Sequence, residues 1–248
     1  MTAPPTEGTK PPGAAGQREA AQWVRHMFAS VAHRYDLLNH LLSFNIDRSW
    51  RRRTVERVEP VLARPAARVL DVCCGTGDLL MALEARRDSA VWGCDFCRPM
   101  LALARRKLAA AEMCCALTEA DALGLPFPDA SIDLVTSAFG FRNLASYQAG
   151  LEEMARVLRP GGLAAILEFS RPPSRVFAAL YDFYSRLLLP AVGGALSGSR
   201  EAYAYLPASV RRFPNAGELA EAMRAAGFRE VSFERMTAGI VALHLGWR

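Results

Sequence analysis

Residues 69–80 read Val69-Leu70-Asp71-Val72-Cys73-Cys74-Gly75-Thr76-Gly77-Asp78-Leu79-Leu80 and decide the fold. A short apolar run ends at two glycines one residue apart, and a pattern that suits a helix follows, so the stretch predicts a strand, a tight turn and a helix. Glycine lets the backbone adopt positive φ and lets a ligand approach the main chain, while the helix start at Asp78 offers unpaired N–H groups. The stretch therefore predicts a nucleotide-binding turn, although two glycines alone indicate it weakly.

A second apolar run, residues 91–94, ends at Asp95. Its spacing from the glycine turn is that at which nucleotide-binding folds place an acid on the two hydroxyls of a ribose. A dinucleotide-binding fold would also place a third glycine three residues after the second, but Leu80 stands at that position. The missing glycine disfavours an oxidoreductase that binds a dinucleotide.

Acidic side chains indicate which ligand the turn would bind. Asp71 and Asp78 flank the glycines and suit an amino group better than a pyrophosphate. S-adenosylmethionine carries an ammonium, a sulfonium, a ribose and an adenine but no phosphate, so it matches a set of acids. Asp95 would accept the ribose hydroxyls, and Asp121 with the backbone of Ala122 would bind the amino edge of the adenine.

The order of the expected elements defines the fold class. From Arg68 onward, strand patterns and helix patterns alternate through five strands, and two further strands over residues 230–235 and 240–245 close the chain. This order predicts an α/β fold with a seven-stranded, mostly parallel sheet and helices on both faces. Ligands bind such sheets at the carboxyl ends of the strands, which is where the acids named above fall.

Composition divides the chain into segments. The first 20 residues are rich in Pro, Gly, Ala and Thr and predict a disordered tail without the layout of a signal peptide. The rest predicts a single domain with an N-terminal helical segment and a helical insertion after the fifth strand. Its expected parts are a helical lid or packed helix pair over 21–65, a cofactor-binding core over 66–170, a helical insertion over 171–213, and a closing helix and strands over 214–248.

The insertion contains the most apolar segment of the chain. Residues 176–190 predict a helix that is apolar on more than one face, which is either deeply buried or meets something apolar. Arg186 and Pro190 interrupt the segment, so it is not expected to span a membrane. We expect a cytoplasmic protein, with peripheral contact to the inner face of the membrane left open.

Charge and cysteine content limit the partners. Lys and Arg outnumber Asp and Glu by 30 to 25, with basic clusters at residues 51–53, 105–107 and 211–212. Such clusters are usually solvated helix faces and otherwise attract anionic partners, but no nucleic-acid-binding signature accompanies them, so nucleic acid is not expected. Six cysteines in three pairs, in a chain without an export signal, predict reduced and buried thiols rather than a metal site.

Three further motifs carry a family resemblance. They are Tyr35-Asp36-x-x-Asn39-x-x-Leu-Ser43 continuing to Trp50, then Phe139-Gly-Phe-Arg142-Asn143, and Arg156-Val-Leu-Arg-Pro-Gly-Gly-Leu continuing to Glu168-Phe-Ser170. With the glycine turn, they resemble the ubiquinone/menaquinone biosynthesis C-methyltransferases, a family of Rossmann-like class I S-adenosylmethionine-dependent methyltransferases. The sequence departs from the family pattern at Asp47, where histidine is usual, and at Cys73 and Ala138.

The resemblance implies transfer of a methyl group from S-adenosylmethionine to a ring carbon of a polyprenylated quinol. The expected substrate is demethylmenaquinol, in the last step of menaquinone biosynthesis, because no mitochondrial-type leader is present and the turn is similar to that of naphthoquinone-pathway members. The alternatives are a benzoquinol of ubiquinone biosynthesis, another small lipid-like substrate, or a binding protein that keeps the fold without catalysis. The insertion would receive the prenyl tail, or serve as core packing or as a homodimer interface.

The motifs also supply the expected site residues. Those expected to bind the cofactor are Asp71, Gly75, Thr76, Gly77, Asp95, Asp121 and Ala122. Methylation of a ring carbon requires the neighbouring quinol oxygen to lose its proton, with a base or a fixed positive charge beside it. Arg142 and Asn143 are expected to hold the forming phenolate, helped by Tyr35 and by Asp36 or Asn39. The alternative for Arg142 is an ion pair with Glu168 that has only a structural role.

Overall fold

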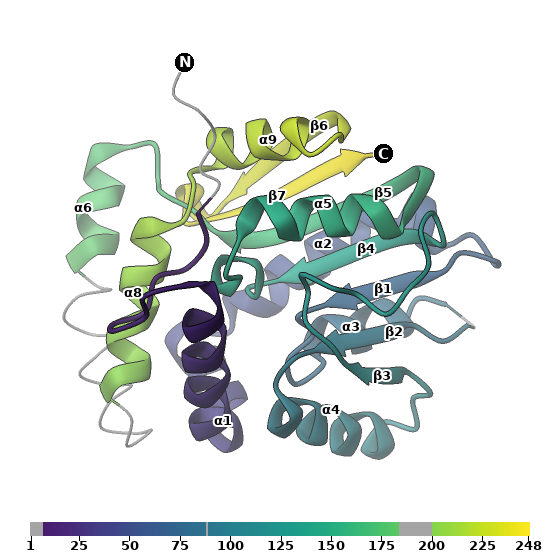
Figure 1. Cartoon of the computed structure of the whole chain (residues 1–248), viewed down its shortest axis with the longest axis horizontal. Coiled ribbons are helices and arrows are strands. Elements are labelled where there is room, and N and C mark those ends of the chain that lie inside the picture. Colours follow the sequence, from purple (N-terminus) through teal and green to yellow (C-terminus); the bar gives the residue numbers. More distant parts are fainter. Residues whose placement is uncertain (1–6, 88, 184–199) are drawn as a thin grey trace.

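The computed structural model describes residues 7–87, 89–183 and 200–248. Its centre is a seven-stranded sheet with the order β3-β2-β1-β4-β5-β7-β6 (Figure 1). The strands are β1 Val69–Val72, β2 Trp92–Asp95, β3 Ala116–Glu119, β4 Ile132–Ala138, β5 Leu158–Phe169, β6 Arg229–Met236 and β7 Val241–Trp247. Strands β3, β2, β1, β4 and β5 are parallel, and β7 runs antiparallel to both β5 and β6. The predicted seven-stranded, mostly parallel sheet is confirmed.

The strand order fixes where a ligand can bind. Strand β1 pairs with β2 on one side and with β4 on the other, so the direction in which the chain adds strands reverses between β1 and β4. In open α/β sheets, a reversal of this kind leaves a crevice at the carboxyl ends of the two strands. The glycine turn follows β1 and the Phe-Gly-Phe-Arg-Asn motif follows β4, so both open onto this crevice.

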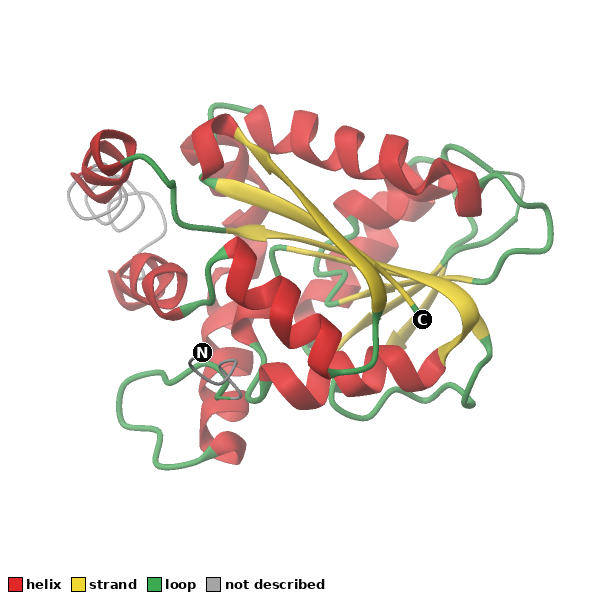
Figure 2. Cartoon of the chain, turned by 90° about the horizontal axis from the view of Figure 1, so that it is seen from above, coloured by secondary structure: helices red, strands yellow, loops and turns green. Residues whose placement is uncertain are grey.

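Helices cover both faces of the sheet (Figure 2). They are α1 Gln17–Leu42, α2 Ile46–Leu62, α3 Asp78–Glu84, α4 Arg98–Ala110, α5 Tyr147–Val157, α6 Arg175–Phe183, α8 Arg200–Arg212 and α9 Ala216–Ala225, with short 3-10 turns η1 Phe141–Asn143 and η3 Thr237–Gly239. Buried side chains form one large core against α5 and α9, including Leu151 and Met223, and another against α2 and α3, including Leu62 and Leu80. Both sheet faces are therefore buried, as a parallel sheet requires.

Local sequence signals set several helix ends. The Ser146 hydroxyl accepts the N–H of Ala149 at 3.2 Å and caps α5. Asn215 and Glu218 form a capping box at the start of α9. Gly227 follows α9 with φ at 96°, a left-handed conformation that glycine adopts without strain.

The predicted disorder of the N-terminal tail is wrong for residues 7–20. Helix α1 already begins at Gln17, and Thr9 is only 4% exposed. The Thr9 N–H donates to the carbonyl of Leu144 at 2.8 Å, and its hydroxyl lies 2.7 Å from the hydroxyl of Tyr205. Composition predicted disorder because a Pro- and Gly-rich segment cannot build a core of its own, but here Leu144 and Tyr205 of the domain supply hydrogen-bond partners.

The insertion is described in two pieces, α6 and α8. The apolar helix predicted over residues 176–190 is described only as far as Phe183, and the rest of it lies outside the described residues. Val176 and Phe177 of α6 are exposed, whereas α8 packs against α1 and η1. Among the described residues, no helix combines the length and the hydropathy that crossing a bilayer requires.

Candidate active site

A pocket occupies the crevice at the carboxyl ends of β1 and β4. Its lining comes from helices α1 to α4, from the glycine turn, from the end of β2, and from the loops after β3 and β4. Six residues predicted to bind the cofactor line it: Asp71, Gly75, Thr76, Asp95, Asp121 and Ala122. Gly77 is not part of the lining; it caps α3 with φ at 91°, and a Cβ there would lie 3.4 Å from the Cβ of Ala104. Gly77 thus shapes the turn and lets α3 approach α4 closely.

Hydrogen bonds hold the acids of the pocket in place. The Oδ2 atom of Asp95 accepts the N–H of Gly75 at 2.9 Å, and its Oδ1 atom accepts the N–H of Cys97 at 2.8 Å. The hydroxyl of Thr136 donates to Asp71 Oδ1 at 2.7 Å. Asp95 therefore ties the end of β2 to the glycine turn, and Asp71 is tied to β4.

The two buried acids carry charge that the protein does not fully offset. Burial raises the pKa of Asp71 to about 7, against the opposing effects of the Thr136 hydroxyl and of Arg51. Burial likewise raises the pKa of Asp95 to about 6, although backbone N–H groups favour its ionised form. A pocket with two such carboxylates suits a ligand that brings positive charge and hydroxyl donors, because either would stabilise the ionised acids. These acceptor groups thus fit S-adenosylmethionine, whose ammonium and sulfonium are positively charged and whose ribose carries hydroxyl donors.

Cys73 occupies an unusual backbone conformation at the base of the pocket. Its φ is 56°, in the region that favours glycine, and a Cβ on Gly140 would lie 2.3 Å from the Cys73 Cβ. The missing side chain of Gly140 is what makes room for this cysteine. Burial, reinforced by neighbouring acids, raises the pKa of the Cys73 thiol, so the group stays protonated and is a poor nucleophile.

The motif after β4 places Asn143 in the pocket and Arg142 behind it. Asn143 is part of the lining, as is Tyr35 of α1, whereas Arg142 is not. Arg142 is 5% exposed; its Nη1 atom lies 2.9 Å from Glu168 Oε1, and its backbone N–H donates to Glu168 Oε2 at 3.1 Å. The ion pair considered for Arg142 on sequence grounds is therefore present. The Arg142 Nε atom is buried without a hydrogen-bond partner.

The remaining predicted residues of α1 serve two different neighbourhoods. Asn39 hydrogen-bonds to Tyr35, and burial raises the pKa of the Tyr35 phenol despite the nearby Arg142. Asp36 accepts the hydroxyl of Thr76 at 2.5 Å and the ammonium of Lys107 at 2.8 Å, and it does not line the pocket. Asn39 thus belongs with Tyr35, whereas Asp36 joins α1 to the glycine turn.

Two residues that the sequence did not single out belong to the site. Arg51 was assigned to a solvated basic cluster, but its side chain is 11% exposed and lines the pocket, whereas that of Arg52 is 67% exposed. Successive helical residues point about 100° apart, so consecutive arginines cannot all face solvent on a packed helix. Tyr205 of α8 donates its hydroxyl to Asn143 Oδ1 at 3.0 Å.

The fold is that of the class I S-adenosylmethionine-dependent methyltransferases. The fold is similar to that of a SAM-dependent methyltransferase from Thermotoga maritima, with a TM-score of 0.62 and 17% identity over 90% of this chain and 98% of that one. It is also similar to the [4+2]-cyclase SpnF, with a TM-score of 0.65 and 18% identity over 97% of this chain and 80% of that one.

Sequence comparison identifies the family. Residues 16–248 match the ubiE/COQ5 methyltransferase family, and the chain belongs to it. The chain is 49% identical to demethylmenaquinone methyltransferase of Thermus thermophilus over 90% of this chain and 100% of the relative. It is 46% identical to that of Deinococcus radiodurans over 97% and 98%, and 44% identical to the ubiquinone/menaquinone biosynthesis C-methyltransferase UbiE of Geobacter sulfurreducens over 92% and 89%. The predicted family and fold class are confirmed.

Proposed function

We propose that the protein transfers a methyl group from S-adenosylmethionine to a ring carbon of demethylmenaquinol. The observation that carries the substrate is the identity of 49% and 46%, over nearly the whole chain, to two relatives named demethylmenaquinone methyltransferase. The observation that supports the cofactor is the pair of buried, incompletely offset carboxylates beside the glycine turn.

Each lining acid has a role toward the cofactor. Asp71 would face the ammonium, and Asp95 would accept the ribose hydroxyls with the lone pairs that Gly75 and Cys97 leave open. Asp121 and the backbone of Ala122 would bind the adenine. When bound, the cofactor supplies an electrophilic methyl group on its sulfonium.

The protein's own part in the chemistry is to hold the quinol and stabilise its phenolate. Asn143 and Tyr35 line the pocket and can hydrogen-bond to a quinol oxygen. Because its pKa is raised, the Tyr35 phenol stays protonated and acts as a donor. Arg142 lies behind them, where Glu168 pairs with it and partly offsets its charge. Because arginine does not lose its proton at neutral pH, Arg142 would contribute the remaining positive charge and the position of Asn143 rather than act as the base.

The exposed apolar residues would meet the prenyl tail or the membrane that holds it. Val176, Phe177 and Phe183 of α6 are 76%, 50% and 59% exposed. Burial of each CH₂ of a prenyl chain is worth about 0.8 kcal/mol, so a long tail needs an apolar surface beside the site. We include peripheral contact with the membrane in the proposal for this reason.

An assay with labelled cofactor tests the proposed function. The purified protein is incubated with S-adenosylmethionine carrying a labelled methyl group and, in separate reactions, with demethylmenaquinol and with the corresponding demethylated benzoquinol. We expect label in the naphthoquinol product and at most weak labelling of the benzoquinol. Preferential labelling of the benzoquinol would replace the proposed substrate, and no labelling of either quinol would contradict the function.

A further inference from the structure

Arg51 is the cation of the pocket. Of the described residues that line it, four are acids, at Asp71, Asp78, Asp95 and Asp121, and Arg51 alone has a basic side chain. Arg51 belongs to α2, so it reaches the crevice from an N-terminal helix rather than from the strand ends. A ligand that carries both an ammonium and a carboxylate would have its positive group matched by the acids and its negative group by this arginine.

A cluster of side chains holds the Arg51 guanidinium. Its Nη1 atom contacts Asp47 one helical turn earlier, and its Nη2 atom lies 3.6 Å from Asp78 Oδ2. The face of the guanidinium lies over the ring of Phe139, with 5.5 Å between Cζ and the ring centroid. Because 3.6 Å exceeds an N–H···O hydrogen bond, Nη2 keeps donor capacity for another acceptor.

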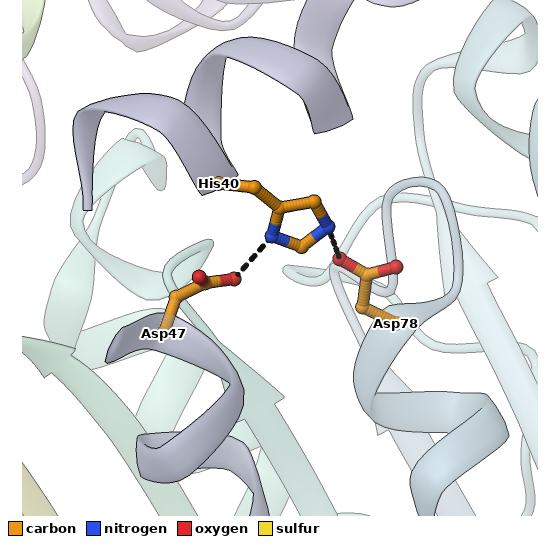
Figure 3. Close-up of side chains that lie close together, drawn as sticks. All are labelled: His40, Asp47 and Asp78. Carbon is orange, nitrogen blue, oxygen red and sulfur yellow. Dashed lines mark hydrogen bonds and ion pairs between the residues drawn. The ribbon is translucent and has the colours of Figure 1, made fainter. Parts of the chain in front are cut away.

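His40 completes the cluster between the two acids, as Figure 3 shows. Its Nδ1 atom lies 2.8 Å from Asp47 Oδ2, and its Nε2 atom lies 3.9 Å from Asp78 Oδ2. Helices α1, α2 and α3 each contribute one of these side chains, so the cluster joins α1 and α2 to the start of α3. The cluster thereby fixes the direction in which Arg51 extends.

The same three side chains have atoms close enough to be considered for a metal ion, all within 4.8 Å of one another. Their charge is already offset, because Arg51 contacts Asp47 and Lys107 contacts the Oδ1 atom of Asp78. Burial alone would raise the pKa of Asp78, but Arg51 and Lys107 outweigh it and hold that pKa below its ordinary value. The cluster is therefore explained by the two cations, and we assign no metal to it.

We propose that Arg51 binds the carboxylate of the methionine moiety of S-adenosylmethionine and that the His40, Asp47 and Asp78 cluster positions it. The proposal rests on the cofactor of the proposed function. A guanidinium presents N–H groups in a fork that matches a carboxylate, and such charge-assisted pairs are stronger than neutral hydrogen bonds. Since Arg51 belongs to α2, binding of the carboxylate would also join α2 to the cofactor.

The test compares two ligands that differ only in the carboxylate. S-adenosylhomocysteine and its decarboxylated analogue are titrated by calorimetry into the wild type, Arg51→Met and Arg52→Met. We expect the wild type and Arg52→Met to bind S-adenosylhomocysteine about 10 to 100 times more tightly than the analogue, as one charge-assisted pair would give. In Arg51→Met that ratio should fall to about 1, with the affinity for the analogue retained.

Different failures have different meanings. If Arg51→Met weakened the binding of both ligands equally, Arg51 would only hold α2 in place and the proposal would be overturned. A wild-type affinity ratio near 1 would also overturn it. If neither adenosyl compound bound to the wild type, the cofactor assignment itself would fail. The wild-type ratio does not depend on how the variant folds, and Arg51→Lys, which keeps the charge but not the fork, should give an intermediate ratio.

Discussion

At the scale of the residue, Asp71 and Asp95 determine how the pocket responds to pH. Burial raises the pKa of Asp71 to about 7 and that of Asp95 to about 6. A ligand with an ammonium group binds the ionised carboxylates, so it must displace protons wherever the pH lies below these values. The affinity for such a ligand should therefore rise with pH and level off once both acids are ionised.

The predicted result is an affinity for S-adenosylhomocysteine that increases at least tenfold between pH 5.5 and pH 8, since a group with a pKa near 7 is only about 3% ionised at pH 5.5. Calorimetry in buffers of constant ionic strength measures it. Asp71→Asn should bind more weakly at pH 8 and show a flatter profile. Methylthioadenosine, which lacks the ammonium, serves as the control ligand, and a flat profile for the wild type with S-adenosylhomocysteine would contradict the role of the acids.

At the scale of the element, helix α8 connects the N-terminal segment to the Phe-Gly-Phe-Arg-Asn motif after β4. The Tyr205 hydroxyl donates to Asn143 at 3.0 Å and lies 2.7 Å from the hydroxyl of Thr9. Tyr205 is 7% exposed, and its ring lies 5.0 Å from that of Trp23 in α1. Three segments far apart in the sequence thus meet at one hydroxyl group.

Tyr205→Phe should lower methyl transfer about tenfold and leave the affinity for S-adenosylhomocysteine unchanged, because Asn143 loses the partner that orients it. Stability should fall by about 1 to 3 kcal/mol, since Asn143 and Thr9 lose a buried partner. Tyr147→Phe is a matched control: its hydroxyl donates to the backbone carbonyl of Arg142 at 3.0 Å and not to Asn143. Single-turnover rates and thermal unfolding measure the two effects, and equal rates in the two variants would argue against a positioning role for Tyr205.

Local signals made most elements predictable from the sequence. The glycine turn was predicted because it depends on neighbours within a few residues, and the Ser146 cap and the capping box at Asn215 are local signals of the same kind. Arg51 and the segment around Thr9 were missed because their environment is made by residues far away in the chain. For Arg51, the aspartate four residues earlier allowed an ion pair, but the exposed Arg52 has such a partner as well, so this spacing did not reveal which arginine faces inward.

The candidate site was predictable to a similar extent. Six of the seven predicted cofactor residues line one pocket, because carboxyl ends of neighbouring parallel strands necessarily meet. The depth of a side chain behind the pocket wall was not predictable: Arg142 lies behind Asn143 although the two are adjacent in sequence. One residue can touch a ligand while its neighbour in the sequence only supports that residue from behind. Packing decides between these two roles, and sequence spacing does not determine the packing.

At the scale of the whole molecule, large apolar side chains are exposed on two helices, α1 and α6. Leu37 and Leu41 at the end of α1 are 68% and 47% exposed, and Val176 and Phe177 of α6 are 76% and 50% exposed. The chain also carries a formal net charge of +5. At a membrane surface, exposed apolar side chains can insert between lipids while a net positive charge attracts anionic head groups.

Under the proposed function, the substrate is held in such a bilayer, so replacing Val176 and Phe177 together with serine should weaken binding to vesicles that contain anionic lipid. The same double variant should methylate a long-chain quinol in those vesicles at least several-fold more slowly, yet act normally on a short-chain quinol in solution, because the pocket lining is unchanged. Vesicle sedimentation and rates with the two quinols measure this difference. Ala109→Ser with Ala110→Ser, at exposed positions of α4, is the control pair. If the methylation rate fell equally with both quinols, α6 would support the structure of the site rather than contact the membrane. Unchanged binding to vesicles would exclude α6 as the membrane contact.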